Sequence, residues 1–64
     1  MLSSLPQDPD MLVSVINMLL RDGEFDSLDS LCSYFDRDRD ELESLLLRHG
    51  FVYNEQQRQM RPVM

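Results

Sequence analysis

The stretch SLDSLCSYFDRDRDELESLLLRHG, from Ser27 to Gly50, decides the fold of this 64-residue chain. Its apolar residues recur at helical spacing in two blocks, which predicts one helix over residues 27–35 and another over 38–49. Asp36 and Arg37 separate the two blocks, and Asp38 can cap the second helix. This succession of helix, tight break and helix is typical of a helix-turn-helix unit.

Both predicted helices have a clear inward face. The first carries apolar residues at i, i+3, i+4 and i+7, namely Leu28, Leu31, Cys32 and Phe35. The second places on one face Leu42, Leu45, Leu46 and His49. We expect Leu31, Leu42 and Leu45 to lie in the core and Leu47 to fall outside the inward face.

A third helix is predicted upstream, over residues 8–22. Asp8 can cap its free amides, Pro9 suits the first helical position, and Gly23 can end it in a left-handed conformation. One narrow polar stripe follows the helix, made of Asp10, Ser14, Asn17 and Arg21. The rest of its circumference is apolar, which is more apolar surface than two short helices can cover.

The sequence after Gly50 changes period. Residues 51–53 are aromatic and β-branched, residues 54–57 are turn-like, and residues 58–61 can return as a second strand with Met60 inward. The pattern predicts a short hairpin; the alternative is an irregular tail that packs Phe51 and Tyr53 on the helices. We therefore predict one mainly α domain over residues 1–64, a three-helix bundle with a helix-turn-helix-like pair and a winged-helix-like C-terminal β-hairpin.

The charge of the chain opposes DNA binding, which a helix-turn-helix pattern would otherwise favour. The net charge is −6, and no residue is a lysine. Between residues 22 and 43, two arginines face nine carboxylates, namely Asp22, Glu24, Asp26, Asp29, Asp36, Asp38, Asp40, Glu41 and Glu43. Non-specific affinity for nucleic acid depends on neutralising phosphates. If DNA were bound, the contacts would come from Arg39, Arg48, Arg58 and Arg61.

No group of residues predicts catalysis, a metal or a cofactor. Cys32 and His49 are the one pair that could support a nucleophile, but each has an ordinary structural position on its helix. Asp36, Asp38 and Asp40 have the spacing of the first calcium ligands, yet the glycine and the glutamate that the loop requires are missing. We expect a protein that is not an enzyme.

The chain carries no membrane-spanning or secretory pattern. Its longest apolar run, residues 11–20, has ten residues and two polar interruptions, whereas a spanning helix needs about 20. The first residues lack a basic region followed by an apolar stretch. We expect no membrane association and a cytoplasmic location.

The apolar surface of the first helix predicts a site for another protein. The candidate residues are Met11, Val13, Val15, Met18 and Leu20. They could form a two-fold homodimer or receive an unidentified protein partner. The alternative is that this surface is covered within the monomer by Leu2 and Leu5 together with Phe51 and Tyr53.

Three motifs extend over nearly the whole chain: PQDPDMLVSVIN at residues 6–17, RDGEFDSL at 21–28 and GFVYN at 50–54. They resemble the motifs of a small bacterial family catalogued only as a domain of unknown function, DUF4250. Family members often end with Asn-Gln-Phe, where this chain has Arg58-Gln59-Met60. The resemblance implies a fold and no biochemical activity. The residues themselves favour an interaction module, with a helix-turn-helix DNA-binding protein as the alternative.

Overall fold

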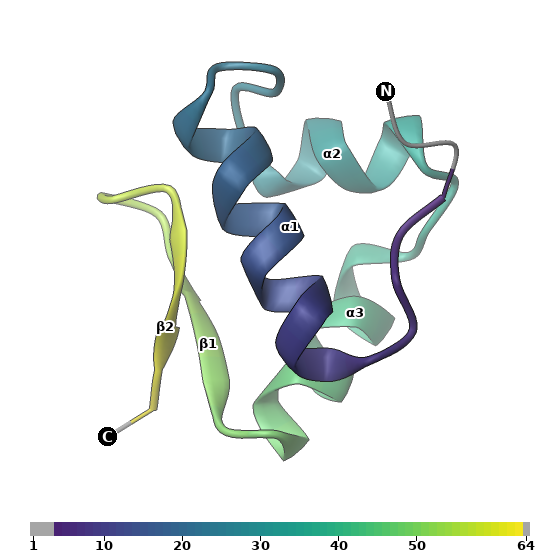
Figure 1. Cartoon of the computed structure of the whole chain (residues 1–64), viewed down its shortest axis with the longest axis vertical. Coiled ribbons are helices and arrows are strands. Elements are labelled where there is room, and N and C mark those ends of the chain that lie inside the picture. The colour runs from purple at the N-terminus through teal and green to yellow at the C-terminus, as the bar shows by residue number, and fades with distance from the viewer. Residues whose placement is uncertain (1–3, 64) are drawn as a thin grey trace.

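Three helices precede a two-stranded antiparallel hairpin in the computed structural model, which describes residues 4–63 (Figure 1). The elements are α1 (Pro9–Arg21), α2 (Leu28–Tyr34), α3 (Arg39–Arg48), β1 (Phe51–Asn54) and β2 (Gln59–Pro62). The predicted fold class is confirmed, including the C-terminal hairpin. Each predicted helix is one residue longer at either end than the observed helix because the prediction included the capping residues.

All three helices begin at a side-chain cap. The Asp8 carboxylate accepts a hydrogen bond from the Met11 amide at 3.1 Å, and the Ser27 hydroxyl accepts one from the Ser30 amide at 3.2 Å. At α3, the Asp38 carboxylate accepts from the Asp40 amide at 2.9 Å. Each cap pairs one of the amides that the first helical turn leaves without an internal partner.

The first two helices end in Schellman motifs, in which the residue after the cap is left-handed. At α1 this residue is Gly23, as predicted, with φ of 80°, and the Glu24 amide donates to the Leu19 carbonyl at 3.1 Å. At α2 it is Asp36, with φ of 57°. Aspartate tolerates this conformation less well than glycine. The break between α2 and α3 thus contains Asp36 in the left-handed conformation.

The core lies where the three helices meet β2. Its buried side chains are Leu5, Leu12, Val13, Ile16, Leu19, Leu20, Leu28, Leu31, Cys32, Leu42, Leu46 and Met60. Two expectations need correction: Leu45 is half-buried at the edge of the core, and His49 is exposed. Both residues lie toward the end of α3, where the chain turns away into β1. The expected contribution of Leu2 falls outside the described residues.

Residue Asn17 holds the hairpin against α1. Its side-chain oxygen accepts from the Met60 amide at 2.7 Å, and its side-chain amide donates to the Met60 carbonyl at 3.2 Å. The Gln59 side-chain amide donates a hydrogen bond to the Asn17 backbone carbonyl at 3.3 Å. Asn17 belongs to the predicted polar stripe of α1, and it is half-buried because β2 lies against this part of α1.

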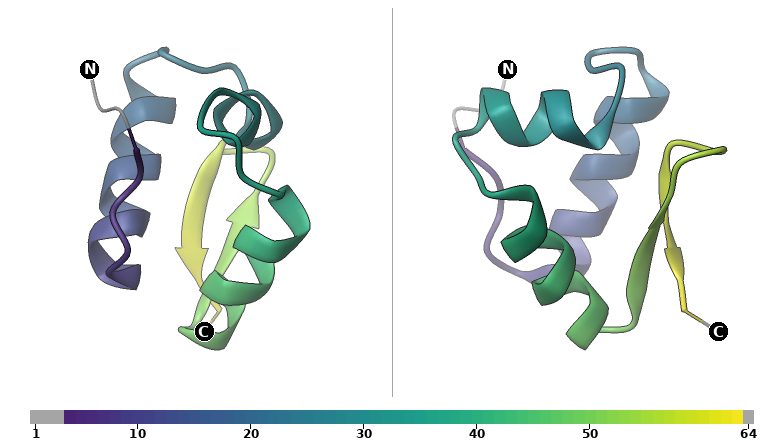
Figure 2. Two further views of the ribbon diagram at one scale, coloured as in Figure 1. Left: turned by 90° about the vertical axis from the view of Figure 1, so that its right-hand side faces the viewer. Right: turned by 180° about the vertical axis from the view of Figure 1, so that it is seen from behind.

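The hairpin contacts two helices, with β2 beside α1 and β1 beside α3. The left view of Figure 2 shows the hairpin between these helices. Its register pairs Tyr53 with Met60 and Val52 with Arg61. Within the loop, Arg58 is left-handed, with φ of 53°, and the Asn54 side chain accepts from the Gln57 amide at 3.1 Å.

Candidate interaction surfaces

The α1 residues that were predicted to bind a partner divide into two groups. Val13 and Leu20 are buried in the core and are not available at the surface. Met11 and Met18 remain 59% and 40% exposed, and Val15 between them is half-buried. Residues at positions 11, 15 and 18 follow one side of a helix. We call these three side chains the α1 stripe.

The alternative, in which other parts of the monomer cover the apolar surface of α1, agrees with the structure in part. Leu5 is buried in the core, and Phe51 and Tyr53 are half-buried against it. The two methionines of the α1 stripe nevertheless remain exposed, and their centres stand about 10 Å apart along the axis at the usual rise per residue. Asp8 and Asp10 lie at the start of this helix and Arg21 at its end, all exposed.

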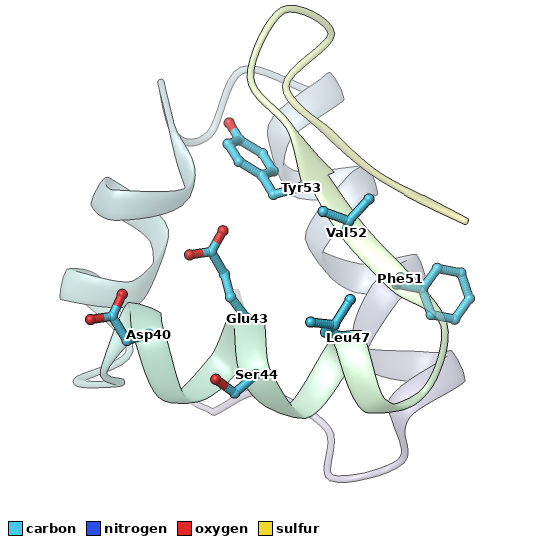
Figure 3. A pocket seen from close by; sticks show the side chains of 7 residues that line it. All are labelled: Asp40, Glu43, Ser44, Leu47, Phe51, Val52 and Tyr53. Carbon is cyan, nitrogen blue, oxygen red and sulfur yellow. The ribbon is translucent and has the colours of Figure 1, made fainter. Parts of the chain in front are cut away.

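A second surface is a groove between α3 and β1, with a volume of about 340 Å³. Figure 3 shows Glu43 and Leu47 rising from α3 toward Tyr53 and Val52 on β1. The complete lining consists of Asp40, Glu43, Ser44, Leu47, Phe51, Val52 and Tyr53. Leu47 and Val52 are 56% and 46% exposed, so the groove presents apolar surface beside two carboxylates.

Residue Arg39 lies at the Tyr53 side of this groove and is held by three carboxylates. Its guanidinium is 2.9 Å from Asp29, 3.3 Å from Glu43 and 3.3 Å from Glu55. It also stands 5.3 Å from the centre of the Tyr53 ring, within the range of a cation–π contact. The hydrogen bond to Asp29, followed by those to Glu43 and Glu55, raises the pKa of Arg39 above its ordinary value. The side chain is only 24% exposed.

The four arginines proposed for the DNA-binding alternative differ in their surroundings. Arg39 already has its three carboxylate partners, and its cluster carries a net charge of −2, one guanidinium against three carboxylates. Arg58, in the hairpin loop, reaches the Asp26 carbonyl at 3.5 Å. Arg48 and Arg61 are exposed at the end of α3 and on β2. Any phosphate near Arg39 would have to compete with carboxylates that are already in place.

The remaining chemical candidates have structural surroundings. Burial raises the pKa of the Cys32 thiol above its ordinary value of 9.0, and the side chain lies in the core. His49 is exposed at the end of α3, and neither His49 nor Cys32 lines the α3–β1 groove. Asp38 is engaged as a helix cap. Across residues 4–63, no cluster of three or more His, Cys, Asp or Glu side chains could hold a metal ion.

Two features escaped the sequence analysis, the α3–β1 groove and the Asn17 contact with Met60. Each combines residues from elements that no local pattern links. The motif that ends at Asn17 did single out this residue, but it did not identify the partner.

No helix in the described part of the chain has both the length and the apolar character needed to cross a bilayer.

The fold defines a small winged-helix-like module of three helices and one hairpin. The model of the family described as domain of unknown function (DUF4250) matches residues 6–60, so the chain belongs to this family. That match includes all three helices and the hairpin as far as Met60. No curated protein and no solved structure matches the chain.

Proposed function

We propose that this protein is a non-enzymatic interaction module that self-associates through the α1 stripe. The observation that carries the proposal is the exposure of Met11 and Met18 on one side of a helix whose opposite side forms the core. Methionine side chains adapt well to an apolar partner surface. Association would remove them from water, which is the main favourable contribution to such contacts.

The stripe is suited to a two-fold pairing of antiparallel helices. A two-fold axis between residues 14 and 15 places Met11 of one copy beside Met18 of the other. The same pairing places the acidic start of one helix, at Asp8 and Asp10, near Arg21 at the end of its partner. Antiparallel helix dipoles also favour this arrangement. Because three side chains form a small interface, we expect a weak, transient dimer.

Sedimentation velocity over a wide concentration range tests this proposal. The wild-type protein is expected to shift from monomer to dimer as the concentration rises, and Met18→Glu is expected to remain a monomer. Val15→Asp should act in the same way, but Val15 also touches the core, so the exposed Met18 gives the cleaner variant. Val52→Glu introduces the same charge on a different exposed apolar residue and serves as the control. A wild-type protein that stays monomeric throughout contradicts the proposal.

The second candidate function is DNA binding by the helix-turn-helix pair. It is favoured by the hairpin, which lies beside α3 as a wing does in winged-helix proteins. The carboxylates around Arg39 oppose it, so we expect no salt-sensitive binding of duplex DNA by the isolated protein. A gel shift that Arg48→Glu together with Arg58→Glu abolishes would support DNA binding instead.

A further inference from the structure

The groove between α3 and β1 contains apolar side chains that remain exposed to solvent. Leu47 from α3 and Val52 from β1 are about half exposed, although each contributes to the wall of a concave site (Figure 3). A volume of about 340 Å³ is at the lower end of small-molecule pockets. The groove is therefore of a size to receive one or two side chains of a larger partner.

The β1 wall of the groove also presents backbone hydrogen-bonding groups. Both backbone groups of Met60 point away from β1, because they bind the Asn17 side chain. The Tyr53–Met60 pair is thus a non-hydrogen-bonded pair of the antiparallel ladder, and the Tyr53 amide and carbonyl point away from β2. The sheet has two strands in the described structure, so this outer edge of β1, which faces α3, has no neighbouring strand. An extended segment could pair with it.

The charge beside the groove selects for a basic occupant. Asp40 and Glu43 belong to its lining, and none of the seven lining residues is basic. Arg39, whose guanidinium stands 5.3 Å from the Tyr53 ring, is bound by Asp29, Glu43 and Glu55, so its charge is more than offset. A polyanion would be repelled by the carboxylates at this groove. Complementary charge both accelerates encounter and excludes wrong partners.

We propose that the α3–β1 groove binds an extended basic segment of another protein. The segment lies along the outer edge of β1, places an apolar side chain on Leu47 and Val52, and directs arginine or lysine toward Asp40 and Glu43. This site is on a different surface from the α1 stripe, and it does not depend on self-association. The site combines the side of α3 next to the hairpin with β1, and it binds a positively charged protein segment.

Titration of the ¹⁵N-labelled protein with synthetic peptides tests the proposal. The probe is a blocked seven-residue peptide of alternating arginine and valine, and two matched peptides replace either arginine by glutamate or valine by serine. The arginine–valine peptide is expected to shift the amide signals of Ser44, Leu47, Val52 and Tyr53, and to bind several-fold more weakly when NaCl rises from about 50 to 200 mM. The two matched peptides are expected to bind at least tenfold more weakly.

Variants then separate this site from the α1 stripe. Leu47→Ser and Asp40→Asn change exposed side chains, so the fold is retained, and each is expected to weaken the arginine–valine peptide about fivefold to tenfold. Met18→Glu abolishes the proposed dimer but leaves peptide affinity unchanged. Failure of self-association with retained peptide binding would overturn only the function proposed for α1.

Four results would overturn the groove proposal. The first is the absence of signal changes at millimolar peptide, and the second is changes centred on α1. The third is equal affinity for the arginine–serine peptide, which would show general attraction to an acidic protein. The last is occupation of the groove by duplex DNA or by a second copy, the latter seen as concentration-dependent shifts of Leu47 and Val52 without peptide.

Discussion

Replacing Asn17 by alanine is expected to destabilise the protein by about 2 kcal/mol. The substitution removes both side-chain bonds to the Met60 backbone, at 2.7 and 3.2 Å. Each intramolecular hydrogen bond contributes about 0.5–1.5 kcal/mol, and a buried group left without a partner costs about 1–3 kcal/mol. Because this site is half-buried, water can reach it in part, which places the sum near the middle of these ranges.

A loss of this size is large for so short a chain. At about 0.05–0.15 kcal/mol per residue, a protein of 64 residues has a free energy of unfolding of about 3–10 kcal/mol. At about 4–8 °C per kcal/mol, the midpoint of thermal unfolding should fall by about 8–16 °C. Circular dichroism at 222 nm measures both temperature and urea unfolding, and the exposed Ser14→Ala on the same helix is the control.

Asn17→Asp tests whether both halves of the contact matter. A carboxylate can still accept from the Met60 amide, but it cannot donate to the Met60 carbonyl until it is protonated. We expect partial burial and repulsion from the Met60 carbonyl to outweigh the bond from the Met60 amide and to raise the pKa of Asp at this position above its unfolded value of about 3.9. Stability associated with the protonated form is present below the unfolded pKa and is lost as pH rises through the folded pKa.

The deficit of Asn17→Asp relative to wild type should accordingly be smaller at pH 3 than at pH 7. Ser14→Asp introduces the same charge at an exposed position and corrects for long-range electrostatics. Amide exchange provides a local measurement, since Met60 should exchange faster in Asn17→Ala. An Asn17→Ala loss below about 0.5 kcal/mol, with the Met60 amide still protected, would refute the reasoning.

Three further predictions follow from particular contacts. Arg58→Asn or Arg58→Gly should relieve the left-handed backbone and stabilise the protein by about 1 kcal/mol in urea unfolding; a loss would show that the bond to the Asp26 carbonyl outweighs the strain. Arg39→Met should cost about 1 kcal/mol at low salt and less in 1 M NaCl, because three carboxylates then repel one another, whereas Arg48→Met should change stability by less than about 0.5 kcal/mol. Cys32 should react slowly with a thiol reagent, and rapid labelling of the folded protein would contradict its burial. Its contribution to stability should be fully present below pH 9 and should fall as the pH rises through its raised pKa. The Cys32→Ala variant should lack this fall.

The parts of the fold that sequence predicted well are those with local causes. Asp8, Ser27 and Asp38 each bind an amide two or three residues away, so a cap can be recognised in a short window. Gly23 ends α1 for an equally local reason, its access to positive φ. Helix existence and helix limits were therefore available before any tertiary contact was considered.

Contacts between distant residues could not be predicted in this way. Asn17 and Met60 are separated by 43 positions, and a polar residue on an apolar helix reads as solvent-facing unless its partner is known. The prediction of a partner site on α1 was also inaccurate because it could not include contacts between distant residues. Val13 and Leu20 were assigned to a surface because α1 is apolar around most of its circumference, yet β2 and the other helices complete a core that includes both.

Two of the carboxylates of the helix-turn-helix pair, Asp29 and Glu43, have a structural role as partners of Arg39. Asp29 from α2, Glu43 from α3 and Glu55 from the hairpin loop meet on this one guanidinium, so three elements are joined at a single positive charge. In a DNA-binding module, an arginine at the start of this helix would be free to approach phosphate or a base edge. Here it is used to hold α2, α3 and the hairpin together. The surplus of carboxylates around it leaves a negative surface beside the Leu47–Val52 groove, where a basic protein segment is complementary and a nucleic acid is not.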